Sequence, residues 1–207
     1  MKAHQIYAAL ALTLLFALTA AVADTRLSSG QIANSLQGVT DTQLSLTAAE
    51  LRQGALDYIH SHPGQSAMGR PALYPQLDKL AQFTVEINFD FNSAAIRPES
   101  YRNVGAIADA LHNPILLGYG ILVIGHTDAV GGREYNLNLS QRRAEAIRDA
   151  LIDPFGVNPG VLQAVGLGEE QLRDPMHPTS GVNRRVQLIN IGKRFCFGRS
   201  GEQFQCP

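Results

Sequence analysis

The sequence predicts an α/β two-layer sandwich with a mixed sheet, preceded by a short helical appendage. Between residues 81 and 192, strand-like and helix-like patterns follow one another in the order β-α-β-α-β-β, which favours helices packed on one sheet. The second of the four strands is a continuous apolar run, typical of a central strand buried on both faces. Two helices can cover only one face of such a sheet, so two layers are expected.

The first half of this region predicts a strand, a helix and a strand. Apolar and polar residues alternate over 83–89, as in a half-buried strand. Turn residues follow, and Pro98 is a good first residue for a helix that ends near Leu111. Asn113-Pro114 stops this helix, and residues 121–125 form the apolar second strand.

The second half predicts a helix and two strands. The glycine pair at 131–132 precedes a helix that begins near Arg133, and Asp153-Pro154 ends it. Residues 162–167 form the third strand, and 168–181 contain two prolines and are expected to be an exposed loop. The last strand covers 185–191, and its apolar residues divide between the two faces of the sheet: Val186 and Leu188 on one, Ile189 and Ile191 on the other.

Residues 1–23 have the pattern of a secretory signal peptide. A short positive start is followed by an apolar core over 6–18 and by the small-residue cleavage site Ala21-Val22-Ala23. The alternative, an uncleaved membrane anchor, is weaker because the apolar run is short for about 30 Å of hydrocarbon. The mature chain would begin at Asp24, and no cysteine near that residue offers a lipoprotein attachment site.

Residues 24–80 are expected to be a helical appendage and a linker. A capping box at 47–50 starts a helix whose apolar stripe is formed by Leu51, Ala55 and Ile59. Prolines and glycines over 61–76 indicate the linker. The stripe leaves two options open, packing on the main domain or on a partner protein. No transmembrane barrel is expected in this segment, since a barrel needs at least about eight strands of about ten residues.

Composition and cysteine usage bound the function. Charged residues make up 17% of the chain and the net charge is −1, so the basic excess of a nucleic-acid binder is missing and no nucleic acid is expected as a partner. In the tail, residues 193–207, Cys196 and Cys206 are predicted to form a disulfide that closes a small loop. The alternative, a reactive thiol pair, lacks the C-x-x-C spacing.

Opposite charges gather where the second strand ends and the second helix begins. Asn136, Leu139 and Arg143 share one face of that helix, and Arg143 leans back toward Asp128. A carboxylate, a guanidinium and free N–H groups at a helix start suit a zwitterion, with its amine at Asp128 and its carboxylate at Arg143. The alternative is structural: Asp128 caps a turn, and Arg143 makes a surface ion pair worth about 0–1 kcal/mol.

No catalytic or metal site is expected, and no cofactor. His126 and Asp128 could suggest a metal site, but a third ligand would have to come from the distant His177, Glu169 or Glu170. No Ser-His or Cys-His pairing has supporting context. An enzyme acting on the cell wall, such as a metal-dependent amidase, therefore lacks a credible ligand set.

The motifs of this region resemble the OmpA-like C-terminal domain family. The resemblance covers about residues 81–192, and Leu167 departs from it because many members carry Tyr there. The matching motifs are Phe89-Asp90-Phe91-Asn92 with Ile96-Arg97-Pro98, Gly125-His126-Thr127-Asp128 with Gly131, Tyr135-Asn136-x-x-Leu139-Ser140-x-Arg142-Arg143-Ala144, Gly166-Leu167-Gly168-Glu169 and Asn183-Arg184-Arg185-Val186.

The resemblance implies non-covalent binding of peptidoglycan through the diaminopimelate residue of its stem peptide. The family's ligand-binding residues fall on Asp128 and Arg143. Its supporting positions fall on Asn92, Thr127, Asn136, Leu139 and Arg184. The implied location is the periplasm, at the cell wall. Any association with the outer membrane would be through a partner. The alternative is an assembly component of an envelope complex in which residues 24–80 recruit a protein.

Overall fold

The computed structural model describes residues 27–38, 47–197 and 203–205 of the 207-residue chain. The predicted signal peptide and the predicted Cys196–Cys206 disulfide lie outside the residues whose side chains are described. Among the described residues, no helix combines the length and the apolar character needed to cross a membrane.

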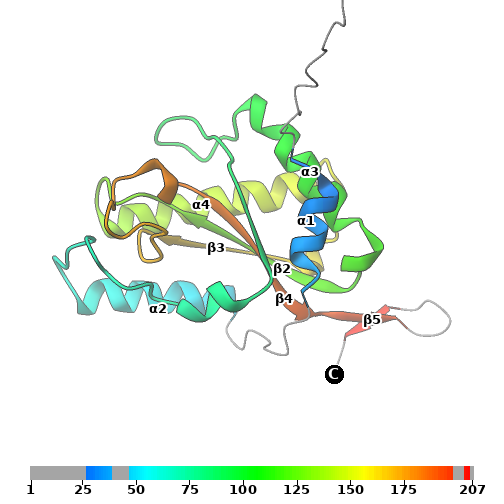
Figure 1. Cartoon of the computed structure of the whole chain (residues 1–207), viewed down its shortest axis with the longest axis horizontal. Coiled ribbons are helices and arrows are strands. Elements are labelled where there is room, and N and C mark those ends of the chain that lie inside the picture. Colours follow the sequence, from blue (N-terminus) through cyan, green and yellow to red (C-terminus); the bar gives the residue numbers. More distant parts are fainter. Residues whose placement is uncertain (1–26, 39–46, 198–202, 206–207) are drawn as a thin grey trace, which may run out of the picture.

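A mixed four-stranded sheet lies at the centre of the molecule (Figure 1). Its strands are β1 (Gln82–Val85), β2 (Tyr119–His126), β3 (Leu162–Gly168) and β4 (Val186–Lys193), in the spatial order β1-β4-β2-β3. Strand β2 runs parallel to β3 and antiparallel to β4. A separate two-stranded ladder joins β5 (Phe195–Phe197) to β6 (Gln203–Gln205). The predicted mixed sheet and the central position of the apolar second strand are confirmed.

The first strand is shorter than the alternation at 83–89 predicts. Its last ladder pair joins Val85 to Val186, the first residue of β4, so the chain has no strand partner beyond this point. Residues 86–97 leave the sheet as a loop, held by an isolated bridge between Phe89 and Ile96. This loop later borders the candidate site.

One face of the sheet is covered by three helices. These are α1 (Ser29–Leu36), α3 (Tyr101–Leu111), which follows the 3-10 turn η2 (Pro98–Ser100), and α4 (Arg133–Ile152). Their apolar side chains pack with those of β1, β2 and β4, including Val186 and Leu188, in one continuous cluster. The order β-α-β-α-β-β over residues 82–193 is therefore confirmed.

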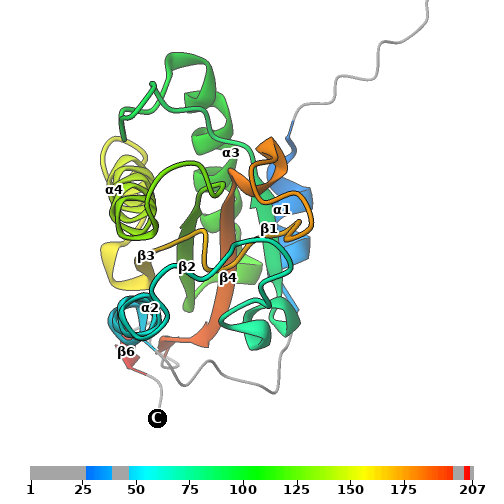
Figure 2. The same cartoon turned by 90° about the vertical axis from the view of Figure 1, so that its left-hand side faces the viewer.

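Residues 48–80 cover the second face of the sheet, which two helices alone would leave open. The helix α2 (Ala48–Ser61) begins at the predicted capping box and directs Leu51, Ala55 and Ile59 toward the sheet. The 3-10 helix η1 (Pro75–Lys79) adds Leu77 to the same apolar cluster, and both views show α2 below β3 (Figure 1, Figure 2). The apolar stripe thus packs on the main domain, the first of the two options that its sequence leaves open. This face includes Leu167, the residue that departs from the family pattern.

Two glycines let α4 approach the sheet closely. A Cβ atom added to Gly125 in β2 would lie 2.4 Å from the carbonyl oxygen of Ser140, and one added to Gly166 in β3 would lie 2.1 Å from the backbone nitrogen of Gln141. Real Cβ atoms do not come so near to backbone atoms. The small residues therefore fix the N-terminal half of α4 against the carboxyl ends of β2 and β3.

The predicted linker pairs with the start of the loop that follows β3. The backbone N–H of Gly69 donates to the carbonyl of Pro175 at 2.8 Å, and that of Leu73 donates to Glu170 at 3.1 Å. Residues 169–171 are consequently buried. The prediction of an exposed loop over 168–181 is wrong for these first residues, because the linker covers them.

Candidate functional site

The candidate site lies at the carboxyl end of β2, where Asp128 begins the turn into α4. Backbone hydrogen bonds hold this turn on both sides: Thr127 N–H donates to the carbonyl of Gly168, and Ala129 N–H to that of Pro178, both at 3.0 Å. Asp128 is buried, with 8% of its surface exposed. The sheet and the loop after β3 therefore fix the position of its carboxylate.

Both oxygens of the Asp128 carboxylate accept hydrogen bonds within the protein. Oδ1 accepts from the backbone N–H of Val130 at 3.2 Å. Oδ2 accepts from Nη1 of Arg184 at 2.6 Å, in an ion pair whose arginine side chain is 57% exposed. The acid therefore pairs with Arg184, a predicted supporting residue, and not with Arg143.

Arg143 is fixed at the opposite side of the site by the 86–97 loop. Its Nε donates to the carbonyl of Ser93 at 3.0 Å, and its guanidinium carbon lies 4.8 Å from the centre of the Phe89 ring. Within the described part of the chain, its terminal Nη groups donate no hydrogen bond. Burial lowers the pKa of this guanidinium, and the nearby charge of Arg184 adds to the effect, while Tyr135 and Asp128 oppose it. A desolvated cation whose terminal donors are free can hold an anion.

Three of the other predicted residues, Asn136, Asn92 and Thr127, lie around Asp128 and Arg143. Asn136 donates to the carbonyl of Asp128 at 3.2 Å and to Oε2 of Glu169 at 2.7 Å. Asn92 has a left-handed backbone, with φ of 52°, and its side-chain oxygen accepts from the hydroxyl of Tyr135. The Thr127 hydroxyl is buried next to Asp128 and has no partner among the described residues.

Leu139, the last predicted residue, is buried but belongs to neither apolar cluster. It lies on α4 between Asn136 and Arg143, one turn from each. The structure thus places the seven predicted residues in the turn after β2, on α4, in the 86–97 loop and directly before β4.

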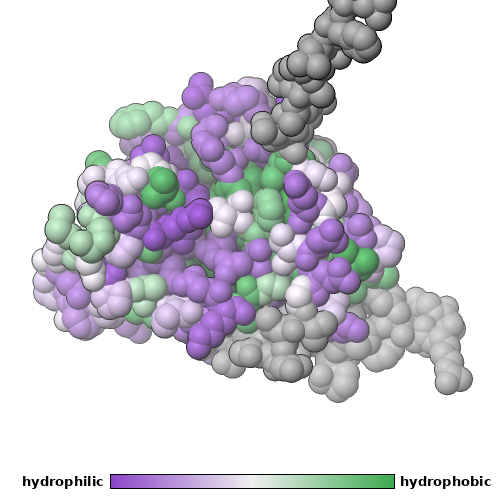
Figure 3. Space-filling view, in the orientation of Figure 1, coloured by the Kyte–Doolittle hydropathy of each residue, from purple (hydrophilic) through white to green (hydrophobic). Residues whose placement is uncertain are grey.

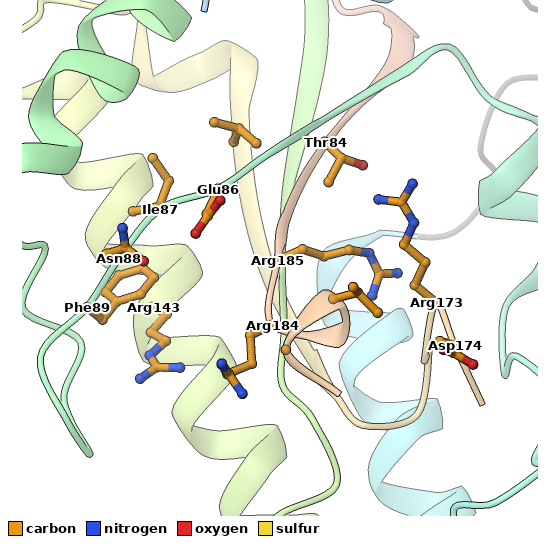
Figure 4. Close-up of a pocket in the computed structure, with 13 residues that line it drawn as sticks. Thr84, Glu86, Ile87, Asn88, Phe89, Arg143, Arg173, Asp174, Arg184 and Arg185 are labelled. Atoms are coloured by element: carbon orange, nitrogen blue, oxygen red, sulfur yellow. The ribbon is translucent and has the colours of Figure 1, made fainter. Parts of the chain in front are cut away.

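A groove of about 750 Å³ adjoins the Asp128–Arg184 pair. It lies between residues 84–89 and residues 173–185, and arginines from α4, from the loop after β3 and from the residues just before β4 surround it (Figure 4). The visible face of the molecule around it is mostly hydrophilic (Figure 3). Its charged lining consists of Arg143, Arg173, Arg184, Arg185, Glu86 and Asp174.

Positive charge predominates in this groove. Burial lowers the pKa of Arg185 to about 10, with a further contribution from the charge of Arg173. Arg185 donates to the carbonyl of Gln171 at 3.1 Å, so its head is fixed. Arg173 is exposed, and in the described structure no carboxylate lies within ion-pair distance of it or of Arg185. The groove is therefore suited to anionic groups of a ligand.

His126 belongs to the scaffold. It is buried, and its Nε2 lies 3.0 Å from Oε1 of Gln187. Burial holds the pKa of the imidazole well below its ordinary value, with a further contribution from Arg185. Within residues 27–38 and 47–194, no three His, Cys, Asp or Glu side chains are grouped to hold a metal, and Glu169 and Glu170 pair with arginines instead.

Several residues around the site were not predicted from the sequence as part of it. Phe89 and Ser93 lie in the opening strand and turn of the family motif, so that motif could have indicated them. Tyr135 and Glu169 likewise lie within matching motifs. Arg173 has no such signal, since it lies in a loop without periodicity.

Comparisons with known proteins identify the region that carries this site. Residues 88–185 match the OmpA family. The chain is 34% identical over 115 residues to outer membrane porin F of Pseudomonas aeruginosa, covering 55% of this chain and 32% of that protein. It is 35% identical over 102 residues to the peptidoglycan-associated lipoprotein of the same organism, covering 48% of this chain and 58% of that protein. The chain thus spans less than two thirds of the length of either relative.

Solved structures with related sequences include two bacterial proteins. The peptidoglycan-associated lipoprotein from Burkholderia pseudomallei is 33% identical, with a TM-score of 0.41 over 50% of this chain and 87% of that one. The cell wall anchor of the type VI secretion system (T6SS) from Pseudomonas aeruginosa is 25% identical, with a TM-score of 0.44 over 60% and 99%. On the sequence matches and the shared motifs, residues 88–185 of this chain are an OmpA family domain.

Proposed function

We propose that this domain binds peptidoglycan non-covalently through the diaminopimelate residue of the stem peptide and tethers the chain to the cell wall. The observation that carries the proposal is the placement of a buried carboxylate, Asp128, beside a groove lined by arginines. One relative is named a peptidoglycan-associated lipoprotein, which supports the same ligand. The role is binding, with no covalent chemistry.

Diaminopimelate carries an amine and a carboxylate on one carbon, and the site has a counterpart for each. The amine goes to the carboxylate of Asp128, and the carboxylate goes to the terminal Nη groups of Arg143. Charge-assisted hydrogen bonds of this kind are about twice as strong as neutral ones. Lysine has the amine without the carboxylate, so a lysine-type stem peptide would leave Arg143 without its partner.

The Asp128–Arg184 ion pair does not block this arrangement. The arginine is more than half exposed, whereas the Asp128 side chain is 12% exposed, so it is the carboxylate that needs a cationic partner. When the ligand amine reaches Asp128, it supplies that partner, and Arg184 can turn into the groove. There it adds a second cation next to Arg143 for the ligand carboxylate.

The alternative role, recruitment of an envelope partner through residues 24–80, is less favoured. Its main support was the apolar stripe of Leu51, Ala55 and Ile59, and these side chains are buried against the sheet of the same chain. On α2 itself, a recruiting surface would have to use the polar side of the helix. We place the protein at the cell wall in the periplasm, and an association with the outer membrane through a partner remains part of this second proposal.

A pull-down with diaminopimelate-type peptidoglycan tests the proposed function. Asp128→Ala and Arg143→Ala should each abolish retention while the protein stays folded. Arg142→Ala is the matched control, because Arg142 is the adjacent arginine on α4, is exposed and does not line the groove. Unchanged retention of both site variants would refute the site, and loss of retention in the control would point to general charge attraction.

A further inference from the structure

A buried cluster of four charged side chains lies behind the candidate site. Nη2 of Arg70 is 3.1 Å from Oε1 of Glu169, and its Nη1 is 3.5 Å from Oε2 of Glu170. Arg133 donates to both oxygens of Glu170, at 2.9 and 2.7 Å. The side chains of Arg70, Glu169 and Glu170 are 2%, 5% and 1% exposed. The two guanidinium groups and the two carboxylates thus neutralise one another in a site that is shielded from water.

The members of this cluster come from three parts of the chain. Arg70 belongs to the segment between α2 and η1, which the sequence presents as a linker. Glu169 and Glu170 directly follow β3, and Arg133 is the first residue of α4. Arg70 also donates to the backbone carbonyl of Glu169 at 2.8 Å. The cluster therefore joins the linker to the start of α4 and to the residues after β3, whose last residue, Gly168, accepts from Thr127 in the Asp128 turn.

A continuous hydrogen-bonded path leads from Arg70 to Asp128. One oxygen of Glu169 faces Arg70, and the other accepts from Nδ2 of Asn136 at 2.7 Å. The same Nδ2 donates to the backbone carbonyl of Asp128 at 3.2 Å. Asn136 is buried as well. Arg70 thus orients the Glu169 carboxylate, which orients the Asn136 amide, and that amide holds the backbone carbonyl of Asp128.

We infer that Arg70 is a positioning residue for the ligand-binding carboxylate. It holds the Glu169 carboxylate in the orientation in which Asn136 fixes the turn that presents Asp128. This inference rests on the proposed function, and it gives the segment between α2 and η1 a part in ligand binding although none of its residues lines the groove.

The physical reason is the position of Glu169. Without Arg70, its carboxylate would be buried without this counter-charge, and it would be expected to rotate toward water. That rotation breaks its hydrogen bond with Asn136, which then no longer fixes the Asp128 backbone. Glu170 keeps its two hydrogen bonds from Arg133, so the effect should concentrate on the Glu169 side of the cluster.

Three variants of the full chain separate positioning from stability. Arg70→Met removes the charge and keeps much of the side-chain length. Leu51→Ala is the matched control, because it weakens the packing of the same covering segment on the sheet but lies outside the hydrogen-bonded path. The double variant with Arg70→Met and Glu169→Gln removes the uncompensated charge, and the glutamine oxygen can still accept from Asn136.

Affinity for a diaminopimelate-containing muropeptide is the first measurement, made where all variants are folded. Arg70→Met should bind about tenfold more weakly, the loss expected when one hydrogen bond to a charged group is no longer held in place. Leu51→Ala should stay within about twofold of the wild type, and the double variant should recover most of the loss. Equal affinities of Arg70→Met and Leu51→Ala would overturn the inference.

Amide hydrogen exchange is the second measurement, and it needs no ligand. The N–H groups of Thr127 and Val130 close the Asp128 turn. In Arg70→Met they should exchange faster relative to Val123 in the centre of β2, whereas in Leu51→Ala their ratio to Val123 should not change. An unchanged ratio in Arg70→Met would also overturn the inference. A wild-type protein that binds no muropeptide would refute the proposed function, while the exchange ratios would still decide whether Arg70 positions the turn.

Discussion

Truncating Leu51 to alanine should destabilise the whole domain, because α2 is part of the core and not an independent appendage. The Leu51 side chain is 0% exposed and packs on the face of the sheet formed by residues of β2, β3 and β4. Truncating a buried leucine to alanine costs about 2–5 kcal/mol, depending on how far the cavity collapses. In a protein of this size, about 3 kcal/mol corresponds to a fall in Tm of roughly 6–12 °C.

Urea unfolding followed by circular dichroism measures this effect. Gln53→Ala is the control on the same helix, since Gln53 is exposed and should change the free energy of unfolding by less than about 0.5 kcal/mol. The wild type should unfold in one transition that includes α2. A Leu51→Ala effect no larger than that of Gln53→Ala, or a separate early transition for α2, would refute the view that residues 48–80 complete the core.

Three further predictions concern the scaffold and the groove. The folded pKa of His126 lies well below its ordinary value of 6.5, so the unfolded chain takes up the proton first. The neutral imidazole therefore adds to the free energy of unfolding above pH 6.5. This stabilisation is lost at up to about 1.4 kcal/mol per pH unit as the pH falls below that value. Comparison of unfolding free energies at pH 7 and 5 should show a shallower slope in His126→Gln, and equal slopes would contradict the assignment. Gly166→Ala should destabilise the domain by more than about 2 kcal/mol, because its Cβ would meet the backbone of α4 at 2.1 Å; a thermal melt like that of the wild type would show that the helix can move away. Arg173→Ala should weaken muropeptide binding by about twofold to fivefold at low salt and by less at high salt, as expected for a screened surface charge; a salt-independent loss would instead indicate a direct, desolvated contact.

Much of the sheet could be predicted because its signals are local. The apolar run of β2, the proline and glycine boundaries of the helices, and the two-sided pattern of Val186, Leu188, Ile189 and Ile191 each appear in short stretches of sequence. The early end of β1 could not be predicted in the same way. It depends on where the partner strand β4 begins, at Val186, and this is a property of the paired strands and not of residues 83–89.

The packing of residues 48–80 on the second face of the sheet also could not be predicted from local sequence patterns. The stripe of α2 predicts that this helix packs on something, but the same stripe suits a partner or the domain itself. Its true position depends on tertiary contacts such as the hydrogen bond from the Tyr74 hydroxyl to the carbonyl of Leu51, at 2.7 Å. Arg70 is the clearest case, since a single arginine in a proline- and glycine-rich segment gives no sign that it will be buried.

In the candidate site, the helix periodicity and the family motifs pointed to Asp128 and Arg143, and the structure places both at the carboxyl end of β2. Arg143, expected to lean toward Asp128, contacts the carbonyl of Ser93 instead, and Asp128 pairs with Arg184. That contact depends on the alignment of β4 with β2, which brings the residues before β4 beside the turn after β2. The assignment of the seven residues to the ligand stays a proposal.

Calorimetric titration with two matched muropeptides tests the central proposal most directly. The peptides differ only in having diaminopimelate or lysine at the third position of the stem. A hydrogen bond to a charged group is worth about 1.5–3 kcal/mol, so the wild type should bind the diaminopimelate peptide roughly tenfold to a hundredfold more tightly. Arg143→Ala should remove this preference. Equal affinity of the wild type for the two peptides would contradict the assignment of Asp128 and Arg143 to the amine and the carboxylate of one ligand.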